Sequence, residues 1–168
     1  MSKPFIAILM GSDSDLPIME ASTAVLKQLD IPFEMKISSA HRTPVATHDY
    51  VVDADKRGCV AFICAAGMAA HLAGAVAANT LKPVIGVPIN SSLDGLDALL
   101  ATVQMPGGIP VATVAIGKAG AKNAAYLAAQ IMATADPALA QRLIAERRAN
   151  TDEVLAKDRA LQERLANS

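Results

Sequence analysis

Short apolar runs alternate with longer segments of helical periodicity along most of this chain. Runs of four to eight apolar residues are typical of strands that are buried on both faces of a sheet. The second run alternates polar and apolar residues, so we expect it near an edge of the sheet. The predicted strands are Phe5–Met10, Phe33–Ile37, Val60–Cys64, Val84–Pro88 and Val111–Ile116.

Segments whose apolar residues recur at helical spacing lie between and after these runs. In the second of them, Thr43 falls at the N-cap and Pro44 at the first helical position, where proline is favoured. Two of the segments are rich in alanine, whose small side chain lets helices pack closely. The predicted helices cover about Asp15–Leu29, Pro44–Lys56, Met68–Thr80, Asp94–Thr102 and Ala119–Thr134.

This alternation of strands and helices predicts an α/β fold, in which helices cover both faces of a parallel sheet. Right-handed crossovers then favour a flavodoxin-like three-layer αβα sandwich with the strand order 2-1-3-4-5. In such folds, ligands bind at the carboxyl ends of the strands, near the point where the strand order reverses.

The chain changes character at Asp136, where charged residues become frequent and leucines are spaced for one or two amphipathic helices. Residues 1–135 are therefore predicted to form a single α/β catalytic domain, and residues 136–168 a C-terminal helical extension. The five-strand sandwich is complete before this extension begins. The extension either packs on a neighbouring subunit or folds back on its own domain, and the sequence pattern favours the two equally.

Hydrophobic residues make up 52% of the chain, but polar residues and glycines interrupt the longest uncharged run, Gly58–Leu81. This run is better explained as a strand, a loop and a helix than as a membrane span, so no membrane partner is expected. Residues 1–5 lack the features of a secretory signal. We therefore expect a cytoplasmic protein.

The 15 basic and 16 acidic residues nearly balance, and aromatic residues are only 3% of the chain, so nucleic acid is not an expected partner. Cys59 and Cys64 flank an apolar run and are interpreted as buried, reduced thiols. Their spacing matches neither a redox pair nor a zinc knuckle. His41, His48 and His71 form no local metal-binding cluster, so no metal is expected.

Polar and small residues follow four of the predicted strands: Gly11–Asp15, Ser38–Arg42, Ala65–His71 and Pro88–Ser92. Because the carboxyl ends of parallel strands meet at one edge of the sheet, these segments are expected to converge on one ligand. The chemistry of this protein is therefore expected at that edge.

The segment Gly11–Asp15 opens a helix, where free N–H groups and serine hydroxyls suit an anion such as phosphate. Ordinary N-capping by Ser12, Ser14 or Asp15 explains the same pattern equally well. Asp13 and Asp15 would repel phosphate, so at least one must point elsewhere. A carboxylate beside a phosphate site commonly accepts hydrogen bonds from ribose hydroxyls.

His41 lies at a predicted helix start beside the permanent cation Arg42. The helix N-terminus and Arg42 both disfavour a charged imidazole, which leaves His41 neutral and able to accept a proton. A structural histidine is the alternative. His48 falls within a helix and is interpreted as a surface or packing residue. For His71, a structural role and a supporting role at the site are equally favoured.

Two further segments have open interpretations. The small residues of Ala65–Met68 could form a dry pocket for an uncharged group, or could serve only tight strand-to-helix packing. The Gly/Pro-rich loop Gln104–Pro110 is a candidate lid, and a rigid connector is the alternative.

Five motifs in order along the chain resemble the PurE family, the N5-carboxyaminoimidazole ribonucleotide mutases of purine biosynthesis. They are Gly-Ser-x-Ser-Asp at 11–15, Ser-Ala-His-Arg-Thr-Pro at 39–44, Ala-Ala-His-Leu at 69–72, Gln-Met-Pro-x-Gly-Ile-Pro-Val at 104–111 and Ala-Ile-Gly-Lys-Ala-Gly-Ala at 115–121. The resemblance implies an enzyme that moves a carboxylate from the exocyclic nitrogen of the substrate to ring carbon C4, through CO2 held in a closed site. No ATP, biotin, metal or other cofactor is implied.

The resemblance also implies roles for individual residues. His41 matches the general acid/base that shuttles the C4 proton. Ala65 and Met68 replace glycines of the family's loop, and Ala73 replaces a proline, so Met68 is expected to narrow the carboxylate pocket. The family's octameric assembly implies a homo-oligomer and fits an extension that reaches a neighbour. Substrate-binding roles are implied or suggested for Ser12, Ser14, Asp15, Ser39, Arg42 and Gly67.

Three alternatives stay open. A related branch of the family carboxylates aminoimidazole ribonucleotide directly with CO2. A phosphoryl-accepting receiver domain has the same fold, with acidic residues after strand one and a lysine, Lys118, after strand five, but it needs an aspartate where this chain has Cys64-Ala65-Ala66. A flavin-binding electron carrier is disfavoured because few aromatic residues are present to stack on a flavin.

Overall fold

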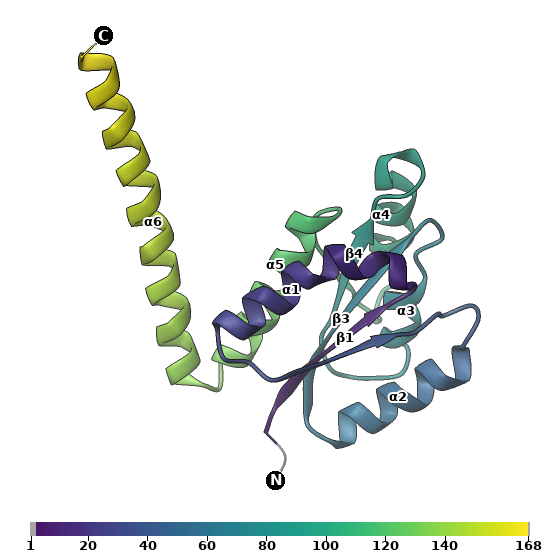
Figure 1. The fold of residues 1–168 in the computed structure, drawn as a ribbon. Helices are drawn as coiled ribbons and strands as arrows, with labels where there is room; N and C mark the ends of the chain where they lie inside the picture. The colour runs from purple at the N-terminus through teal and green to yellow at the C-terminus, as the bar shows by residue number, and fades with distance from the viewer. Residues whose placement is uncertain (1–2, 168) are drawn as a thin grey trace.

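The computed structural model of this chain describes residues 3–167. Its five strands form one parallel sheet in the order β2-β1-β3-β4-β5, which confirms the predicted flavodoxin-like order (Figure 1). The alternating second strand does lie at an edge. The strands are β1 (Phe5–Met10), β2 (Phe33–Ile37), β3 (Cys59–Gly67), β4 (Val84–Ile89) and β5 (Ala112–Thr113).

Six α-helices and two 3₁₀ turns connect and extend these strands among the described residues. Pro44 opens its helix at the first position, as predicted, and Thr43 occupies the N-cap without donating or accepting a capping bond through its side chain. The helices are α1 (Leu16–Gln28), α2 (Pro44–Lys56), α3 (Leu72–Ala77), α4 (Leu96–Val103), α5 (Lys118–Ala133) and α6 (Pro137–Ala166). The 3₁₀ turns are η1 (Asp13–Asp15) and η2 (Leu93–Gly95).

The helices cover both faces of the sheet and make the predicted three layers (Figure 1). Alternate residues of β1 enter opposite cores, with Ile6 and Ile8 on the α1/α5 face, and Ala7 and Leu9 on the α2/α3 face. This is the pattern of a strand buried on both sides. The α1/α5 face is closed by fully buried alanines of α5, which allow the helix to lie close to α1 and the sheet: Ala121, Ala124, Ala125, Ala128 and Ala129.

β3, α3 and β5 differ most in length from their predicted bounds. β3 runs on to Gly67, because Ala65–Gly67 continue to pair with Val87–Ile89 of β4, so these residues are strand and not loop. The helix predicted over Met68–Thr80 is only α3, since Met68 takes a left-handed backbone conformation (φ 54°) that a helix cannot contain. β5 is two residues long.

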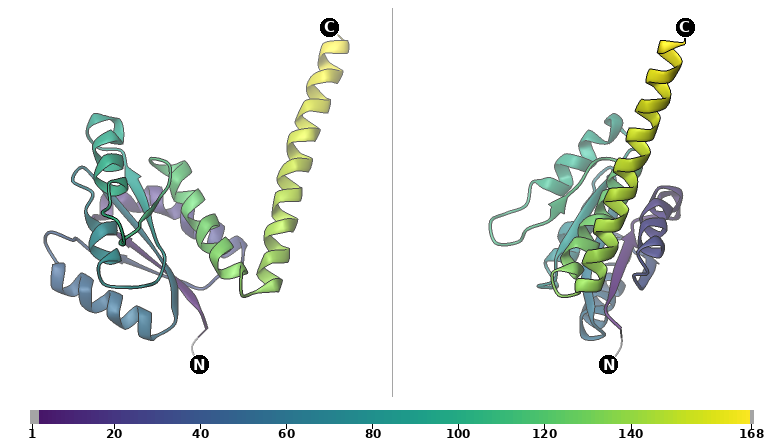
Figure 2. Two further views of the ribbon diagram at one scale, coloured as in Figure 1. Left: turned by 180° about the vertical axis from the view of Figure 1, so that it is seen from behind. Right: turned by 90° about the vertical axis from the view of Figure 1, so that its left-hand side faces the viewer.

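The C-terminal extension is one continuous helix, α6, and its N-cap Asp136 accepts hydrogen bonds from two backbone N–H groups at 3.0 Å. Its first turns pack on the domain, where Leu139 is buried and Arg142 Nε donates to Leu29 O at 3.0 Å. Residues 147–167 are exposed, and the helix leads away from the sheet (Figure 2). Within residues 3–167, no helix has the length and hydropathy needed to cross a membrane.

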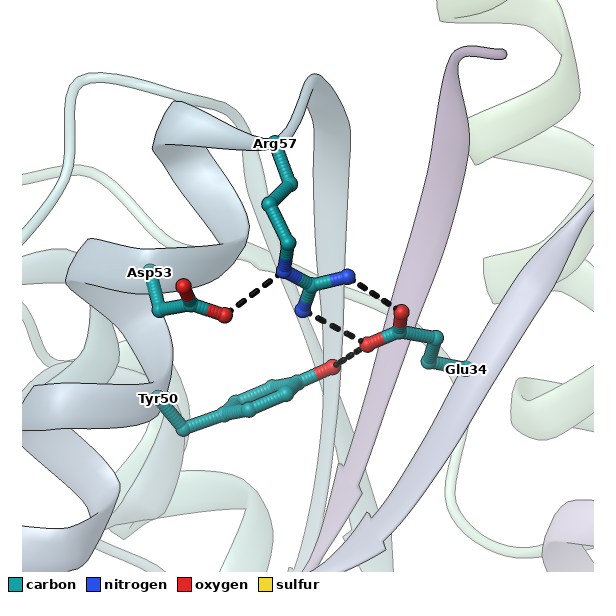
Figure 3. A network of polar contacts seen from close by, with 4 residues as sticks. All are labelled: Glu34, Tyr50, Asp53 and Arg57. Carbon is teal, nitrogen blue, oxygen red and sulfur yellow. Dashed lines mark hydrogen bonds and ion pairs between the residues drawn. The ribbon is translucent and has the colours of Figure 1, made fainter. Parts of the chain in front are cut away.

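A polar network ties α2 to the edge strand β2 (Figure 3). Arg57 donates to both carboxylate oxygens of Glu34 and, through Nε, to Asp53 at 2.6 Å. Tyr50 donates its hydroxyl to Glu34 at 2.9 Å. The guanidinium also lies 5.1 Å from the ring centre of Phe5. The hydrogen bonds from Arg57, the largest effect, and from Tyr50 lower the pKa of the Glu34 carboxyl. The network also fixes α2, the helix whose other end follows His41.

Candidate active site

One cavity of about 610 Å³ opens at the carboxyl edge of the sheet, and its lining comes from the segments that follow β1, β2, β3 and β4. The structure thus brings the four strand-end segments together, as expected. All residues given a catalytic or substrate-binding role from the sequence line this cavity: Ser12, Ser14, Asp15, Ser39, His41, Arg42 and Gly67. The cavity is also lined by His71, for which a supporting role had stayed open, and by Ala40, Asn90 and Ser91 of the converging segments, which had been given no individual role. Ile18 of α1 lines it too and was not expected there.

The turn after β1 is held by a capping box. Ser12 Oγ accepts a hydrogen bond from the Ser14 N–H at 3.3 Å, and the Ser12 N–H donates to Asp15 Oδ2 at 3.2 Å. The two serine hydroxyls are themselves 3.0 Å apart. N-capping is therefore present in this turn, and both serines line the cavity as well.

The two acidic residues of this turn have different surroundings. Asp13 is exposed and accepts a hydrogen bond from Ser12 Oγ at 3.1 Å. Asp15 is only 6% exposed. Burial, the largest effect, raises the pKa of the Asp15 carboxyl, the Ser12 N–H opposes it, and the charge of Asp13 adds to it. A buried carboxylate on the cavity wall is suited to accept hydrogen bonds from the hydroxyls of a sugar.

The turn after β2 positions His41 and Arg42. Ser38 is buried, and its hydroxyl lies 2.7 Å from Thr47 Oγ1 in the first turns of α2. Ser39 Oγ accepts the Arg42 N–H at 3.1 Å, which closes the turn. Arg42 is exposed and takes no part in the ion pairs found among residues 3–167. Its guanidinium is therefore available to an anion at the cavity rim.

The imidazoles of His41 and His71, which both line the cavity, contact each other. His41 Nε2 lies 2.7 Å from His71 Nδ1, and the ring planes are inclined by 80° with their centres 4.8 Å apart. The residues are 30 positions apart, in the segments that follow β2 and β3. Sequence spacing did not predict this contact, because β1 lies between these two strands in the sheet.

The end of β3 forms a further wall of the cavity from backbone and small side chains. A Cβ atom on Gly67 would lie 3.3 Å from the carbonyl oxygen of Ile89, so glycine permits the close approach of β3 and β4 here. Met68 follows with φ 54° and a side chain that is 58% exposed. Its carbonyl accepts the Ala70 N–H at 2.9 Å, which turns the chain toward His71.

Other candidates from the sequence lie away from this cavity. His48 Nδ1 is 2.9 Å from Asn79 Oδ1 at the exposed surface, which agrees with a surface role. The loop 104–110 leads into β5, the edge strand on the other side of the sheet from β2. There Gly108–Pro110 line a second cavity of about 680 Å³. No residue of this loop lines the first cavity in the described structure, and its role as a lid stays a prediction.

The two thiols are buried and free, as expected. Burial raises the pKa of Cys59 to about 11 and that of Cys64 still further, so neither is a ready nucleophile. Within residues 3–167, no three His, Cys, Asp or Glu side chains gather into a potential metal site.

Comparison with known proteins places this arrangement in a family. The AIR carboxylase family model matches residues 5–153. N5-carboxyaminoimidazole ribonucleotide mutase of Mycobacterium tuberculosis is 51% identical over 165 residues, which cover 98% of this chain and 93% of that protein. Phosphoribosylaminoimidazole carboxylase of Ogataea methanolica is 56% identical over 137 residues, or 81% of this chain and 25% of that protein.

Comparison of the fold with solved structures identifies a relative of the same kind. The crystal structure of Treponema denticola PurE superposes with a TM-score of 0.84 at 30% sequence identity, covering 93% of this chain and 97% of that one. The resemblance that five short motifs carried is thereby confirmed over nearly the whole chain. This chain belongs to the AIR carboxylase family.

Proposed function

We propose that this protein is an N5-carboxyaminoimidazole ribonucleotide mutase, which moves the carboxylate of its substrate from the exocyclic nitrogen to ring carbon C4 in purine biosynthesis. The observation that carries the proposal is the cavity of about 610 Å³ at the carboxyl edge of the sheet. There His41, a serine-rich turn and Arg42, which has no ion pair within residues 3–167, converge beside small uncharged side chains. The identity of 51% to a mutase over nearly its full length supports the same reaction.

His41 is the proton shuttle in this proposal. When the carboxylate leaves the exocyclic nitrogen as CO2, that nitrogen must gain a proton, and when C4 attacks the CO2, that carbon must lose one. The two transfers balance, so one imidazole that takes the C4 proton and returns a proton to nitrogen suffices. His41 lines the cavity, and within residues 3–167 only its Nε2 has a hydrogen-bond partner, so Nδ1 is available to a substrate.

The remaining candidates bind the ribonucleotide. Arg42 and the serines Ser12, Ser14 and Ser39 offer a cation and hydroxyls to its phosphate, and Asp15 offers a carboxylate to its ribose. A phosphate anchor far from the reacting atoms supplies binding energy that orients the ring for reaction. Asp13 is exposed and does not line the cavity, so it is not part of this set.

The wall formed by Ala66, Gly67 and Ala69 is where the migrating group would lie. It offers CO2 no charge and no side-chain nucleophile. A pocket of this kind keeps water away, and water would otherwise convert CO2 to bicarbonate before it reaches C4. Gly67 contributes because its lack of a side chain lets β3 and β4 approach closely at this wall.

Direct carboxylation of aminoimidazole ribonucleotide is the second candidate, and the 56% identity to a protein named as a carboxylase favours it. The experiment supplies each substrate separately, with and without bicarbonate, and follows formation of the C4-carboxylated product. We expect turnover of the N5-carboxylated substrate with no dependence on bicarbonate. Turnover that requires aminoimidazole ribonucleotide and bicarbonate would instead assign the carboxylase reaction.

We also propose that the protein acts in the cytoplasm as a homo-oligomer in which the distal part of α6 packs on a neighbouring subunit. Two buried, free thiols suit a reducing compartment. Val154, Leu155 and Leu161 are at least 40% exposed on a helix segment that leaves its own domain. Burial of these side chains against another copy would remove apolar surface from water.

A further inference from the structure

Two polar side chains of the active-site cavity have no part in the roles proposed so far. Asn90 and Ser91 follow β4, are exposed and line the cavity. Within residues 3–167, neither side chain donates or accepts a hydrogen bond. Their donor groups are therefore available to a ligand.

The strand order places these two residues away from the proposed phosphate site. Along the edge of the sheet, the serines and Arg42 follow β1 and β2, the uncharged wall follows β3, and Asn90 and Ser91 follow β4. A ribonucleotide whose phosphate lies at the ends of β1 and β2 would extend its ring across the wall, toward the end of β4.

Ser91 lies directly beside this wall. A Cβ atom on Gly67 would lie 3.5 Å from the Cβ atom of Ser91, so the side chain of Ser91 begins next to the place proposed for the migrating group. The side chains of Ala66, Gly67 and Ala69 contain no hydrogen-bond donor. A carboxylate at this wall therefore has the hydroxyl of Ser91 as a neighbouring side-chain donor.

The turn that follows β4 holds this segment in place. Leu93, Asp94 and Gly95 have φ angles of 47°, 55° and 82°, so three successive residues take a left-handed conformation. The Gly95 N–H donates to Ser92 O at 2.9 Å, and a Cβ atom on Gly95 would lie 3.2 Å from Asn90 Cα. The turn thus folds back on the backbone before Ser91. Strain of this kind concentrates at functional sites.

We infer that Ser91 is a substrate-binding residue whose hydroxyl donates a hydrogen bond to the carboxylate that migrates. This group is an anion on the exocyclic nitrogen and again on C4, and it is neutral CO2 in between. A hydroxyl donates more strongly to an anion than to a neutral group, so Ser91 holds both carboxylates and lets CO2 move. A cationic side chain at the same place would oppose release of CO2 more strongly. This inference rests on the proposed function.

Ser91→Ala tests the contact with two ligands that differ in the carboxylate, the C4-carboxylated product and aminoimidazole ribonucleotide. Calorimetric titration is expected to show affinity for the product falling by about 10-fold or more, as for a lost hydrogen bond to a charged group. Affinity for aminoimidazole ribonucleotide should not change. Ser91→Cys, which keeps the size of the side chain but donates weakly, should behave as Ser91→Ala. Ser92→Ala is the matched control, because Ser92 does not line the cavity, and it should bind both ligands as the unsubstituted protein does.

The C4-carboxylated product is common to the mutase and carboxylase reactions, so the titration does not depend on which of the two occurs. Unchanged affinity of Ser91→Ala for the product would overturn the inference, as would an equal loss of affinity for both ribonucleotides. Absence of mutase turnover in an unsubstituted protein whose preference for the product depends on Ser91 would count against the proposed function alone. An unsubstituted protein that binds neither ribonucleotide would overturn both.

Discussion

His41 and Arg42 are adjacent in the chain but serve different parts of the bound ribonucleotide in the proposed reaction. His41→Asn is expected to lower kcat by about 10²- to 10⁴-fold, the contribution of a general acid/base, and to leave product affinity largely unchanged. Arg42→Ala is expected to weaken affinity through the lost phosphate contact. Steady-state kinetics measure kcat of each variant, and calorimetric titration measures the affinity of each variant for the product. Near-normal turnover in His41→Asn would remove it as the proton shuttle, and unchanged affinity in Arg42→Ala would remove the phosphate contact.

Met68 combines a strained backbone with a side chain that lines the site. A glycine at this position would remove the cost of the left-handed conformation, about 1 kcal/mol for a residue other than glycine. It would also give the unfolded chain more freedom, which lowers stability by roughly 0.5–1 kcal/mol. Met68→Gly is therefore expected to change the melting temperature little. We expect it instead to release more CO2 to solvent, so that more aminoimidazole ribonucleotide forms for each product molecule.

The control for this prediction is Met68→Ala, which removes the same side chain but keeps the strained backbone. Equal leakage in the two variants would assign the effect to the lost thioether. Leakage in neither variant would show that Met68 does not close the pocket.

Much of the site could be predicted from sequence because parallel strands place their carboxyl ends at one edge. That rule alone brings Ser12, Ser39 and His41 into one cavity. The partner of His41 could not be found this way, since strand ends give a common edge but no distances between side chains. Asp15 shows the same limit, because its burial depends on how the turn after β1 closes.

At the scale of elements, Gly120 fixes how α5 leaves the sheet. A Cβ atom there would lie 1.6 Å from the carbonyl oxygen of Ala115, a backbone atom that no side-chain rotation can move. Gly120→Ala is expected to destabilise the fold by about 3 kcal/mol or more, at the upper end for overpacking. Urea unfolding at equilibrium measures this, and Gly107→Ala, where nothing lies within 4 Å, is the control with no expected effect. Equal midpoints for the two variants would contradict the prediction.

The network in Figure 3 makes the docking of α2 on β2 dependent on pH. Arg57→Ala is expected to cost about 1 kcal/mol, since the side chains of Arg57 and Glu34 are 38% and 39% exposed and solvent screens the pair. Because Arg57 lowers the pKa of Glu34, this stabilisation is present above the ordinary glutamate value of about 4.3 and is lost as pH falls through the lowered value.

The stability difference between Arg57→Ala and the unsubstituted protein should therefore be full near neutral pH and shrink in acid. Denaturant midpoints at several pH values test this. A difference that stays constant into acid would mean that Glu34 does not contribute through its charge. Arg57→Lys, which keeps the charge but loses the two-pronged contact, should lie between the two proteins.

The type of each element, helix or strand, could be predicted from the apolar periodicity of the sequence. The length of an element could not, because it depends on strand pairing and on backbone strain. β3 gained Ala65–Gly67 because β4 continues beside it, and α3 lost its predicted first turn at Met68. Neither effect is visible in a periodic pattern. α6 extended to one long helix because nothing in its sequence interrupts the helical geometry after Pro137.

At the scale of the whole molecule, α6 has a part that completes the domain and a part that leaves it. Removal of residues 150–168 keeps Leu139, Arg142 and Glu146, which contact the domain, and deletes the exposed segment. We expect the truncated chain to retain its secondary structure but to form smaller assemblies than the full chain. Light scattering coupled to size-exclusion chromatography measures the mass of each.

Leu161→Asp in the full chain is the matched control, because it changes the exposed face of the helix without shortening it. It should reduce assembly in the same direction. If both altered chains keep the mass of the full chain, α6 does not pack on a neighbour.

The central place of β1 also bears on how the protein is made. β1 leaves the ribosome before both strands that pair with it, and the pairing of Phe5 with Cys59 spans more than fifty residues. The helix that closes one of its faces, α5, comes later still. The nascent chain therefore exposes one apolar face of the sheet until α5 has been made, and we expect chains whose translation stops before α5 to aggregate.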